Sequence, residues 1–346
     1  MRKLVIDATG DGSLSEEAVK VNQRALIDKI LARYSTKYTL FREMIQNADD
    51  ATASEVQIRF VTKDVESGAN ELLKAENTKE ERAYTGVAIC NNGFPFRDED
   101  FARIKSIADG NPDEQKIGFF GVGFYSSFSV SEEPCVLSGQ RAMSFHWNGD
   151  MLFVTNGIPP PSKDKSGEVA VILDMVEKQW TVFDLPCRSE KSIENTIPDM
   201  NDFAGFLLRC LSFTSNISSI EVFVDGNKTV SVGQKPVGDV EQVTRPPNIP
   251  KRAFIGDKDK MLCFKRATCT TMNFGCQLYG QEATSRSSVS SAGAESDFGL
   301  IELVRVDAWF QVNLDKEFKE SMMRITKKNP PKEIKIRLLY QTSEKE

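Results

Sequence analysis

Histidine and long apolar runs are what this sequence most clearly lacks. It has one histidine, His146, in 346 residues, and none of its cysteines forms a CxxC pair. Structural zinc is usually held by such Cys and His pairs, so the evenly spaced Cys263, Cys269 and Cys276 do not indicate a zinc site. No segment reaches the roughly 18 apolar residues that a membrane-spanning helix needs, so we expect no membrane partner.

The charge balance and the cysteine count exclude further classes. With 44 Lys and Arg against 50 Asp and Glu, the net charge is -6, and without a long basic cluster we expect no nucleic-acid partner. Seven cysteines, an odd number, are interpreted as reduced buried thiols, rather than as a disulfide framework, in a soluble cytoplasmic or nuclear protein. Asp7 and Asp11 interrupt the first twelve residues, so we expect no signal peptide there. The chain has no nucleophile-elbow motif, which argues against a Ser-His-Asp hydrolase.

What the sequence does contain is a predicted helix with a polar stripe, LFREMIQNADDA, at residues 40–51. At 100° per residue, Glu43, Asn47 and Asp50 share one narrow side of this helix. The residues of the opposite, apolar side are Phe41, Met44, Ile45 and Ala48. An ordinary amphipathic helix with one solvated side has the same pattern, so the stripe alone does not identify a site.

Two later stretches follow this helix in a specific order. The strand-like run VAICNNGFPF breaks at the turn formers of residues 91–93, and IGFFGVGFYSSFSV then has GxxGxG spacing from Gly118 to Gly123 before a helix-compatible run. One glycine-rich loop is weak evidence, because packing turns also use glycine. However, backbone N–H groups near a helix start can hold phosphate oxygens. The polar stripe could supply a Mg²⁺ ligand and an acceptor for a water proton.

In this order the motifs resemble the GHKL superfamily, and within it the ATPase domain of the ninety-kilodalton heat-shock chaperones and of sacsin. VNQRALIDKILARYSTKYTLFREMIQNADDA is similar to the first two helices of those domains, and IGFFGVGFYSSF to their second glycine motif. WTVFDLPCR, residues 180–188, resembles a later strand of sacsin-type domains. NNGFPF and KKNPPK are also similar to strings in a group of large fungal sacsin-like proteins. The resemblance runs from about Val21 to Arg188.

The resemblance implies an α+β fold of the GHKL (Bergerat) type, a two-layer α/β sandwich with a mixed sheet. It also implies ATP or ADP and Mg²⁺ as cofactors, with Glu43 orienting and deprotonating the attacking water and Asn47 as the metal ligand. The polar segment 97–116 would be a mobile lid. The implied nucleotide-binding residues are Asn47, Asp50, Asn91, Gly93, Phe96, Lys116, Gly118, Gly121, Val122, Gly123, Phe124 and Thr181.

Three positions depart from the family pattern. Asn91 stands where most members have an aspartate that accepts a hydrogen bond from the adenine amino group, although the amide oxygen can also accept it. Replacing a charged acceptor by a neutral one costs about 1 kcal/mol, or roughly fivefold in affinity. Pro95 replaces the second glycine of this loop and removes an N–H group. Trp180 replaces the glycine before Thr181.

Two functions remain open. The first is Mg-dependent ATP binding and slow hydrolysis by a chaperone-like ATPase. Its expected partners are client proteins and, through ATP-dependent self-association, further copies of the chain. The second is a non-hydrolysing nucleotide-sensing scaffold. For a catalytic cation the first candidate is Lys316, followed by Lys327 and Lys328. A histidine-kinase function is disfavoured because FHWNGD, around His146, indicates a strand and turn.

The sequence predicts an ATP-binding domain at 1–235, a proline-bearing linker at 236–255, and the start of a second α+β domain at 256–346. A Ser/Ala-rich stretch at 283–297 is predicted to be a disordered loop, and the charged stretch at 63–84 a solvated excursion. We expect the first helix at 14–34, with Ser13 and Glu16 as a capping box. EVAVILDM, residues 168–175, is predicted to be a strand, and the last strand ends so close to Glu346 that we expect a longer protein.

Overall fold

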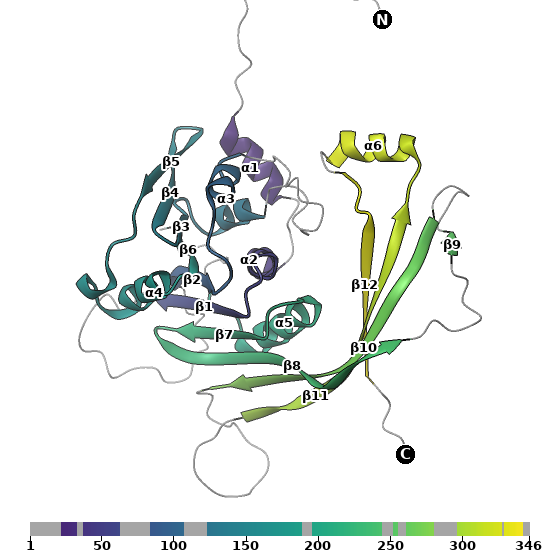
Figure 1. Cartoon of the computed structure of the whole chain (residues 1–346). Coiled ribbons are helices and arrows are strands. Elements are labelled where there is room, and N and C mark those ends of the chain that lie inside the picture. The colour runs from purple at the N-terminus through teal and green to yellow at the C-terminus, as the bar shows by residue number, and fades with distance from the viewer. Residues whose placement is uncertain are drawn as a thin grey trace, which may run out of the picture.

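The computed structural model describes residues 22–32, 37–62, 84–106, 123–188, 196–243, 252–254, 261–279, 296–326 and 329–341. Its strands belong to one mixed sheet with the order β12-β11-β10-β8-β7-β1-β2-β6-β3-β4-β5, and β9 pairs with β10 (Figure 1). Strands β1 and β7 run parallel, while β1 and β2 run antiparallel. The predicted α+β class with a mixed sheet is therefore confirmed.

The strands and helices have the following bounds. The strands are β1 Glu55–Thr62, β2 Tyr84–Asn91, β3 Cys135–Ser138, β4 Arg141–Asn148, β5 Met151–Gly157, β6 Thr181–Pro186, β7 Ser219–Val224, β8 Asn227–Val243, β9 Arg252–Phe254, β10 Met261–Leu278, β11 Ser296–Asn313 and β12 Glu333–Tyr340. The α-helices are α1 Gln23–Leu31, α2 Thr39–Asp50, α3 Asp98–Arg103, α4 Gly167–Glu177, α5 Met200–Phe213 and α6 Lys316–Thr326. Two short 3-10 helices are η2 Phe124–Ser129 and η3 Ser162–Asp164.

Helix α2 lies on the sheet with its apolar side facing the strands. Phe41, Met44, Ile45 and Ala48 are all buried, as the stripe pattern predicts. The Phe41 ring lies 5.0 Å from the Phe203 ring of α5 and 5.9 Å from the Phe60 ring of β1, centroid to centroid. Edge-to-face aromatic pairs of this kind add about 0.5–1.5 kcal/mol each beyond area burial. The packing therefore turns the polar stripe of α2 away from the core.

Alternation along β2 assigns its residues to two faces of the sheet. Val87 and Ile89 join the core beneath α2, whereas Ala88 and Cys90 join a second apolar cluster beneath α4. Because successive strand side chains point to opposite faces, Asn91 belongs to the α2 face. The strand thus delivers a polar residue to the same face as the polar-striped helix.

Helix α4 corrects one prediction. Residues 168–175, EVAVILDM, were expected to form a strand because β-branched residues favour strands. They instead lie in α4, which buries Ile172, Leu173, Met175 and Val176 against the sheet. Tertiary packing of this almost wholly apolar segment outweighs its β propensity. As a result, α4 covers the face of the sheet opposite α2 in this region.

The other predicted elements agree with the structure except at their ends. The first helix begins at Gln23, where the Asn22 side chain accepts a hydrogen bond from the Ala25 amide, rather than near residue 14. The predicted capping box, residues 63–83 of the charged stretch and residues 283–295 of the predicted loop lie outside the described residues. Residues 296–297 of that loop instead begin β11. Residues 236–243 of the predicted linker belong to β8, which pairs with β10. The division into two domains stays a prediction.

All seven cysteines are free thiols, but only Cys90 and Cys276 are buried, so the prediction of buried thiols is wrong for the other five. Burial raises the pKa of Cys90 to about 12 and that of Cys135 to about 11. Because a thiol reacts through its thiolate, these two remain protonated and unreactive at neutral pH. Among the described helices, none is long and apolar enough to cross a membrane.

Helix α4 is anchored by a buried ion pair. The Arg59 side chain of β1 and the Glu168 side chain of α4 are 6% and 13% exposed, and they form a hydrogen-bonded pair. Arg59 Nη1 also donates to Gln57 Oε1 at 2.7 Å, and its guanidinium carbon lies 4.1 Å from the Phe223 ring centre. The pair is thus closed off from solvent on several sides.

We predict that Glu168→Ala lowers the free energy of unfolding by about 3–5 kcal/mol, because it leaves the Arg59 charge buried without its partner. Asp174→Ala on the same helix is the matched control, since it removes only the exposed pair with Lys178 and should cost less than about 1 kcal/mol. Urea unfolding measures both. Equal, small losses in the two variants would contradict the anchoring role of Glu168.

Candidate functional site

The polar stripe of α2 meets the end of the glycine-rich segment. A Cβ atom at Gly123 would lie 3.2 Å from Glu43 Oε2 and 3.8 Å from both side-chain amide atoms of Asn47. Gly123 directly precedes η2, so the backbone at the start of that helix runs past the two stripe residues. The structure therefore brings Glu43, Asn47 and Gly123 together, although they are up to 80 residues apart.

Glu43 is held from one side. Its side chain is 16% exposed, and its Oε1 atom lies 3.3 Å from Nη2 of Arg42. The other oxygen, Oε2, is the one that faces Gly123. The carboxylate thus uses one oxygen in an ion pair and presents the other towards the glycine-rich segment. Asp50, the third stripe residue, is half-buried at the end of α2.

The turn after β2 is docked against the end of α2. A Cβ atom at Gly93 would lie 2.7 Å from the Ala51 carbonyl oxygen and 2.8 Å from Ala51 Cβ, so only glycine fits there. The Gly93 amide donates to Asn91 Oδ1 at 3.1 Å, and the Phe94 amide donates to the Ala51 oxygen at 2.9 Å. These contacts fix Asn91 relative to the helix that carries Glu43 and Asn47.

Hydrogen bonds of the Asn92 side chain attach the same turn to the start of β1. Its Oδ1 atom accepts hydrogen bonds from the amides of Ser54 and Glu55, each at 2.9 Å, and its Nδ2 atom donates to Ser54 Oγ at 2.9 Å. The side chain of Asn92 is therefore used within the protein, and its neighbour Asn91 is the residue of the pair that lies on the α2 face of the sheet.

A row of polar side chains crosses three strands on the α2 face. Asn91 of β2 stands opposite Thr181 of β6 in the strand register. The Thr181 and Ser138 hydroxyls are 2.6 Å apart, and Ser138 Oγ accepts a hydrogen bond from the Phe96 amide at 2.9 Å. Asn91, Thr181 and Ser138 are all buried. Ser138 was not predicted, because no sequence motif marks it and only the strand pairing reveals it.

Two predicted nucleotide-binding residues use their side chains for packing. The Phe124 ring is 6% exposed and lies 4.8 Å from the Phe145 ring. The Phe96 ring lies 5.3 Å from the Phe101 ring and 6.0 Å from the Phe183 ring. These side chains join the aromatic core beside the site, so direct contact with a ligand would come chiefly from their backbone.

Asp49, between the stripe and the apolar side of α2, is a second residue that sequence reasoning missed. It is buried, and its carboxylate accepts hydrogen bonds from the amides of Ser215 and Asn216 at 2.7–3.0 Å. The only sequence signal is a carboxylate next to Asp50 at a helix end, which does not tell the two roles apart. Asp49 joins α2 to the segment after α5.

Several predicted site residues lie outside the described residues. They are Lys116, Gly118, Gly121, Val122, Lys327 and Lys328, together with residues 107–116 of the predicted lid. The earlier part of the lid contains α3. Lys316 begins α6, where its side chain is 91% exposed and 3.8 Å from Glu320. Figure 1 shows α6 beyond the ends of β11 and β12, apart from α2.

We predict that Gly93→Ala lowers the free energy of unfolding by about 1–3 kcal/mol, as overpacking typically does, because its methyl group would press on the Ala51 backbone. Gly157→Ala is the control, since no atom lies within 4 Å of a Cβ at that position. Its expected change is within about 0.5 kcal/mol. Thermal unfolding compares the two, and equal midpoints would show that the turn does not need glycine.

Comparison with known proteins identifies similar sequences. A family profile described as the sacsin domain matches residues 20–210. Sacsin of Homo sapiens is 35% identical over 115 residues, which are 32% of this chain and 2% of that protein. Chaperone protein HtpG of Bordetella parapertussis is 33% identical over 138 residues, or 34% of this chain and 21% of that protein.

A longer match is found in the HtpG of Frankia casuarinae. It is 32% identical over 199 residues, covering 52% of this chain and 30% of that protein. The matched segments thus span less than a third of each of these three relatives. The profile match extends across α2, the turn after β2, η2 and β6, which are the elements that build the site.

Proposed function

Because the chain belongs to the sacsin domain family and is related to the HtpG chaperones, we propose that it is a chaperone-like ATPase domain that binds ATP with Mg²⁺ and hydrolyses it slowly. The observation that carries this proposal is the approach of Gly123 to Glu43 and Asn47. The backbone segment that would approach the phosphates lies there directly against the carboxylate that would act on water and the amide that would bind Mg²⁺. Closure of the lid segment 97–116 would couple binding to conformational change and self-association.

The base of the nucleotide would lie over the polar row. Asn91 would meet the adenine amino group through its amide oxygen, with Thr181 beside it and Ser138 holding Thr181 in place. Gly93 would let the backbone approach the base closely. Gly118, Gly121 and Gly123, with Lys116, would face the phosphates, and Asp50 would support the floor of the pocket.

The described residues fit a Mg²⁺ ion that is bound together with the phosphates. Mg²⁺ prefers oxygen ligands, keeps several waters, and is usually held by few protein groups plus substrate phosphates. No group of three His, Cys, Asp or Glu within the described part of the chain could hold a metal ion. Asn47 would therefore supply one amide oxygen, and the bound ion would neutralise phosphate charge.

Glu43 is the residue that we assign to the chemistry. Its Oε1 atom faces Arg42 and its Oε2 atom faces Gly123, which supports Oε2 as the atom that would accept a proton from a water beside the phosphates. General-base assistance of this kind is typically worth about 10²–10⁴-fold in rate. Slow turnover is expected because Lys316, the first candidate for a catalytic cation, lies on α6, apart from α2.

A non-hydrolysing nucleotide sensor is the second candidate function. Asn91 Oδ1 already accepts a hydrogen bond from the Gly93 amide, so an adenine amino group would share an acceptor that is neutral and in use. This favours weaker binding than a free carboxylate would give. The two functions differ in one measurable quantity, the rate of phosphate release.

We predict opposite phenotypes for two substitutions one helical turn apart. Asn47→Ala should weaken Mg-dependent ATP binding by roughly tenfold or more, as loss of a bond to a charged group does. Glu43→Ala should leave the dissociation constant nearly unchanged and abolish turnover, because the carboxylate acts only on the water. Calorimetry with ATP and ADP, with and without Mg²⁺, measures binding, and phosphate release measures turnover.

Asp174→Ala, which removes an exposed carboxylate on the opposite face of the sheet, is the control and should alter neither quantity. A wild-type rate that Glu43→Ala does not change would eliminate Glu43 as the base. Binding of ATP without any release of phosphate would favour the sensor. No binding of either nucleotide would reject both functions.

A further inference from the structure

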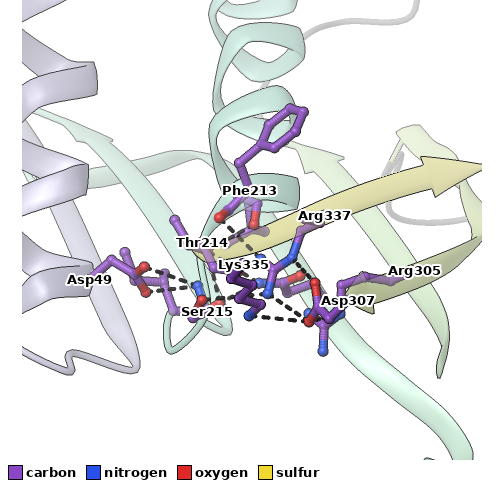
Figure 2. Close-up of polar contacts among 11 residues, drawn as sticks. Asp49, Phe213, Thr214, Ser215, Arg305, Asp307, Lys335 and Arg337 are labelled. Carbon is purple, nitrogen blue, oxygen red and sulfur yellow. Dashed lines mark hydrogen bonds and ion pairs between the residues drawn. The ribbon is translucent and has the colours of Figure 1, made fainter. Parts of the chain in front are cut away.

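The segment Phe213 to Asn216, here called the connector, ends α5 and leads to β7. The amide groups of its residues Ser215 and Asn216 donate to Asp49 of α2, as Figure 2 shows for Ser215. The Ser215 amide lies 2.9 and 3.0 Å from the two carboxylate oxygens of Asp49, and the Asn216 amide lies 2.7 Å from Oδ1. Asn216 Nδ2 also donates to the Asp49 carbonyl at 2.9 Å. The last turn of α2 is therefore tied to the connector.

The carbonyl groups of the connector face β12 instead. Nη1 of Arg337 donates to the Phe213 oxygen at 3.0 Å and to the Thr214 oxygen at 2.5 Å (Figure 2). The end of a helix leaves such carbonyls unpaired and carries the negative end of the helix dipole, so a guanidinium group suits this place. Arg337 thus caps α5 from a strand more than 120 residues later in the sequence.

Arg337 is itself held in one orientation. Its Nε and Nη2 atoms donate to the two carboxylate oxygens of Asp307 in β11, at 2.7 and 3.1 Å, in a two-point pair. Both side chains are 9% exposed. Burial alone would raise the pKa of Asp307, but the bonds and charges of Arg337 and Lys335 lower it below its usual value. The carboxylate stays ionised and keeps the guanidinium plane fixed.

We propose that Arg337 is a positioning residue for the nucleotide site: from β12 it fixes the connector, and through Asp49 the connector fixes the last turn of α2, which carries Asn47 and Asp50. The inference rests on the proposed nucleotide site for its functional consequence, but the link itself is a property of the nucleotide-free protein. Through this link, movement of β11 and β12 would shift Asn47, and binding of a ligand to Asn47 would in turn shift the two strands.

Hydrogen exchange of the nucleotide-free chain tests the link. Arg337→Gln removes the charge and the fork, and we expect the Ser215 and Asn216 amides and the last turn of α2 to exchange at least about tenfold faster, as loss of a charge-assisted pair implies. Lys265→Gln is the matched control, because it breaks the ion pair with Glu333 between β10 and β12 without touching the connector. It should leave those amides unchanged.

Arg337→Lys is the second variant. Lysine keeps the charge beside Asp307 but cannot serve the carbonyls and the carboxylate through one planar fork, so it should retain the fold and still speed exchange in the connector and in α2. If its exchange in both places equals that of the wild type, or if exchange rises uniformly over the chain, the proposal is overturned.

The functional consequence is measured by a double-mutant cycle on ATP affinity. Asp49→Asn and Arg337→Lys should each raise the dissociation constant several-fold, and the double variant should be no worse than the worse single variant, because both act on one connector. If the effects of the two substitutions on the dissociation constant are fully additive, Asp49 and Arg337 do not act through the same connector. Absence of ATP binding in the wild type would reject the proposed function, whereas the exchange comparison would still decide on the link.

Discussion

The docking of helix α2 on the sheet is the constraint on which the rest of the site depends. Phe41, Met44, Ile45 and Ala48 bury one side of the helix, and this fixes its rotation about its own axis. Since the polar stripe is the opposite side of the same helix, the rotation also decides where Glu43 and Asn47 point. A helix turned by one residue, or 100°, would present other side chains to Gly123.

The end of α2 is constrained more tightly than its middle, and by polar contacts. The Ala51 carbonyl oxygen accepts a hydrogen bond from the Phe94 amide, and Ala51 leaves no room for a side chain at Gly93. The Asp49 carboxylate accepts hydrogen bonds from two amides of the connector. Asp49 and Asp50 are therefore adjacent carboxylates with different uses. Asp49 is buried and accepts the amides of the connector, whereas Asp50 is half-buried and lies on the polar stripe.

Much of this could be predicted from sequence because the signals are local. Period-3.6 patterning located α2 and its faces, and turn chemistry located the end of β2. Ser138, Asp49 and Arg337 escaped prediction because their roles come from pairing between segments up to 167 residues apart. The strand predicted at residues 168–175 was wrong because β propensity is local, while the burial of α4 against Ala88 and Val182 is not.

Pro95 stands where the family pattern has a glycine, and the turn is nevertheless held by hydrogen bonds. Proline lacks an N–H group, which suggests a weakened loop. In this turn, however, the hydrogen bonds come from the amides of Gly93, Phe94 and Phe96, the residues on either side of the proline. The fixed φ of Pro95 then reduces the freedom of the unfolded loop without removing a bond that the folded loop makes. The turn can therefore keep Asn91 facing the α2 side although its second glycine is missing.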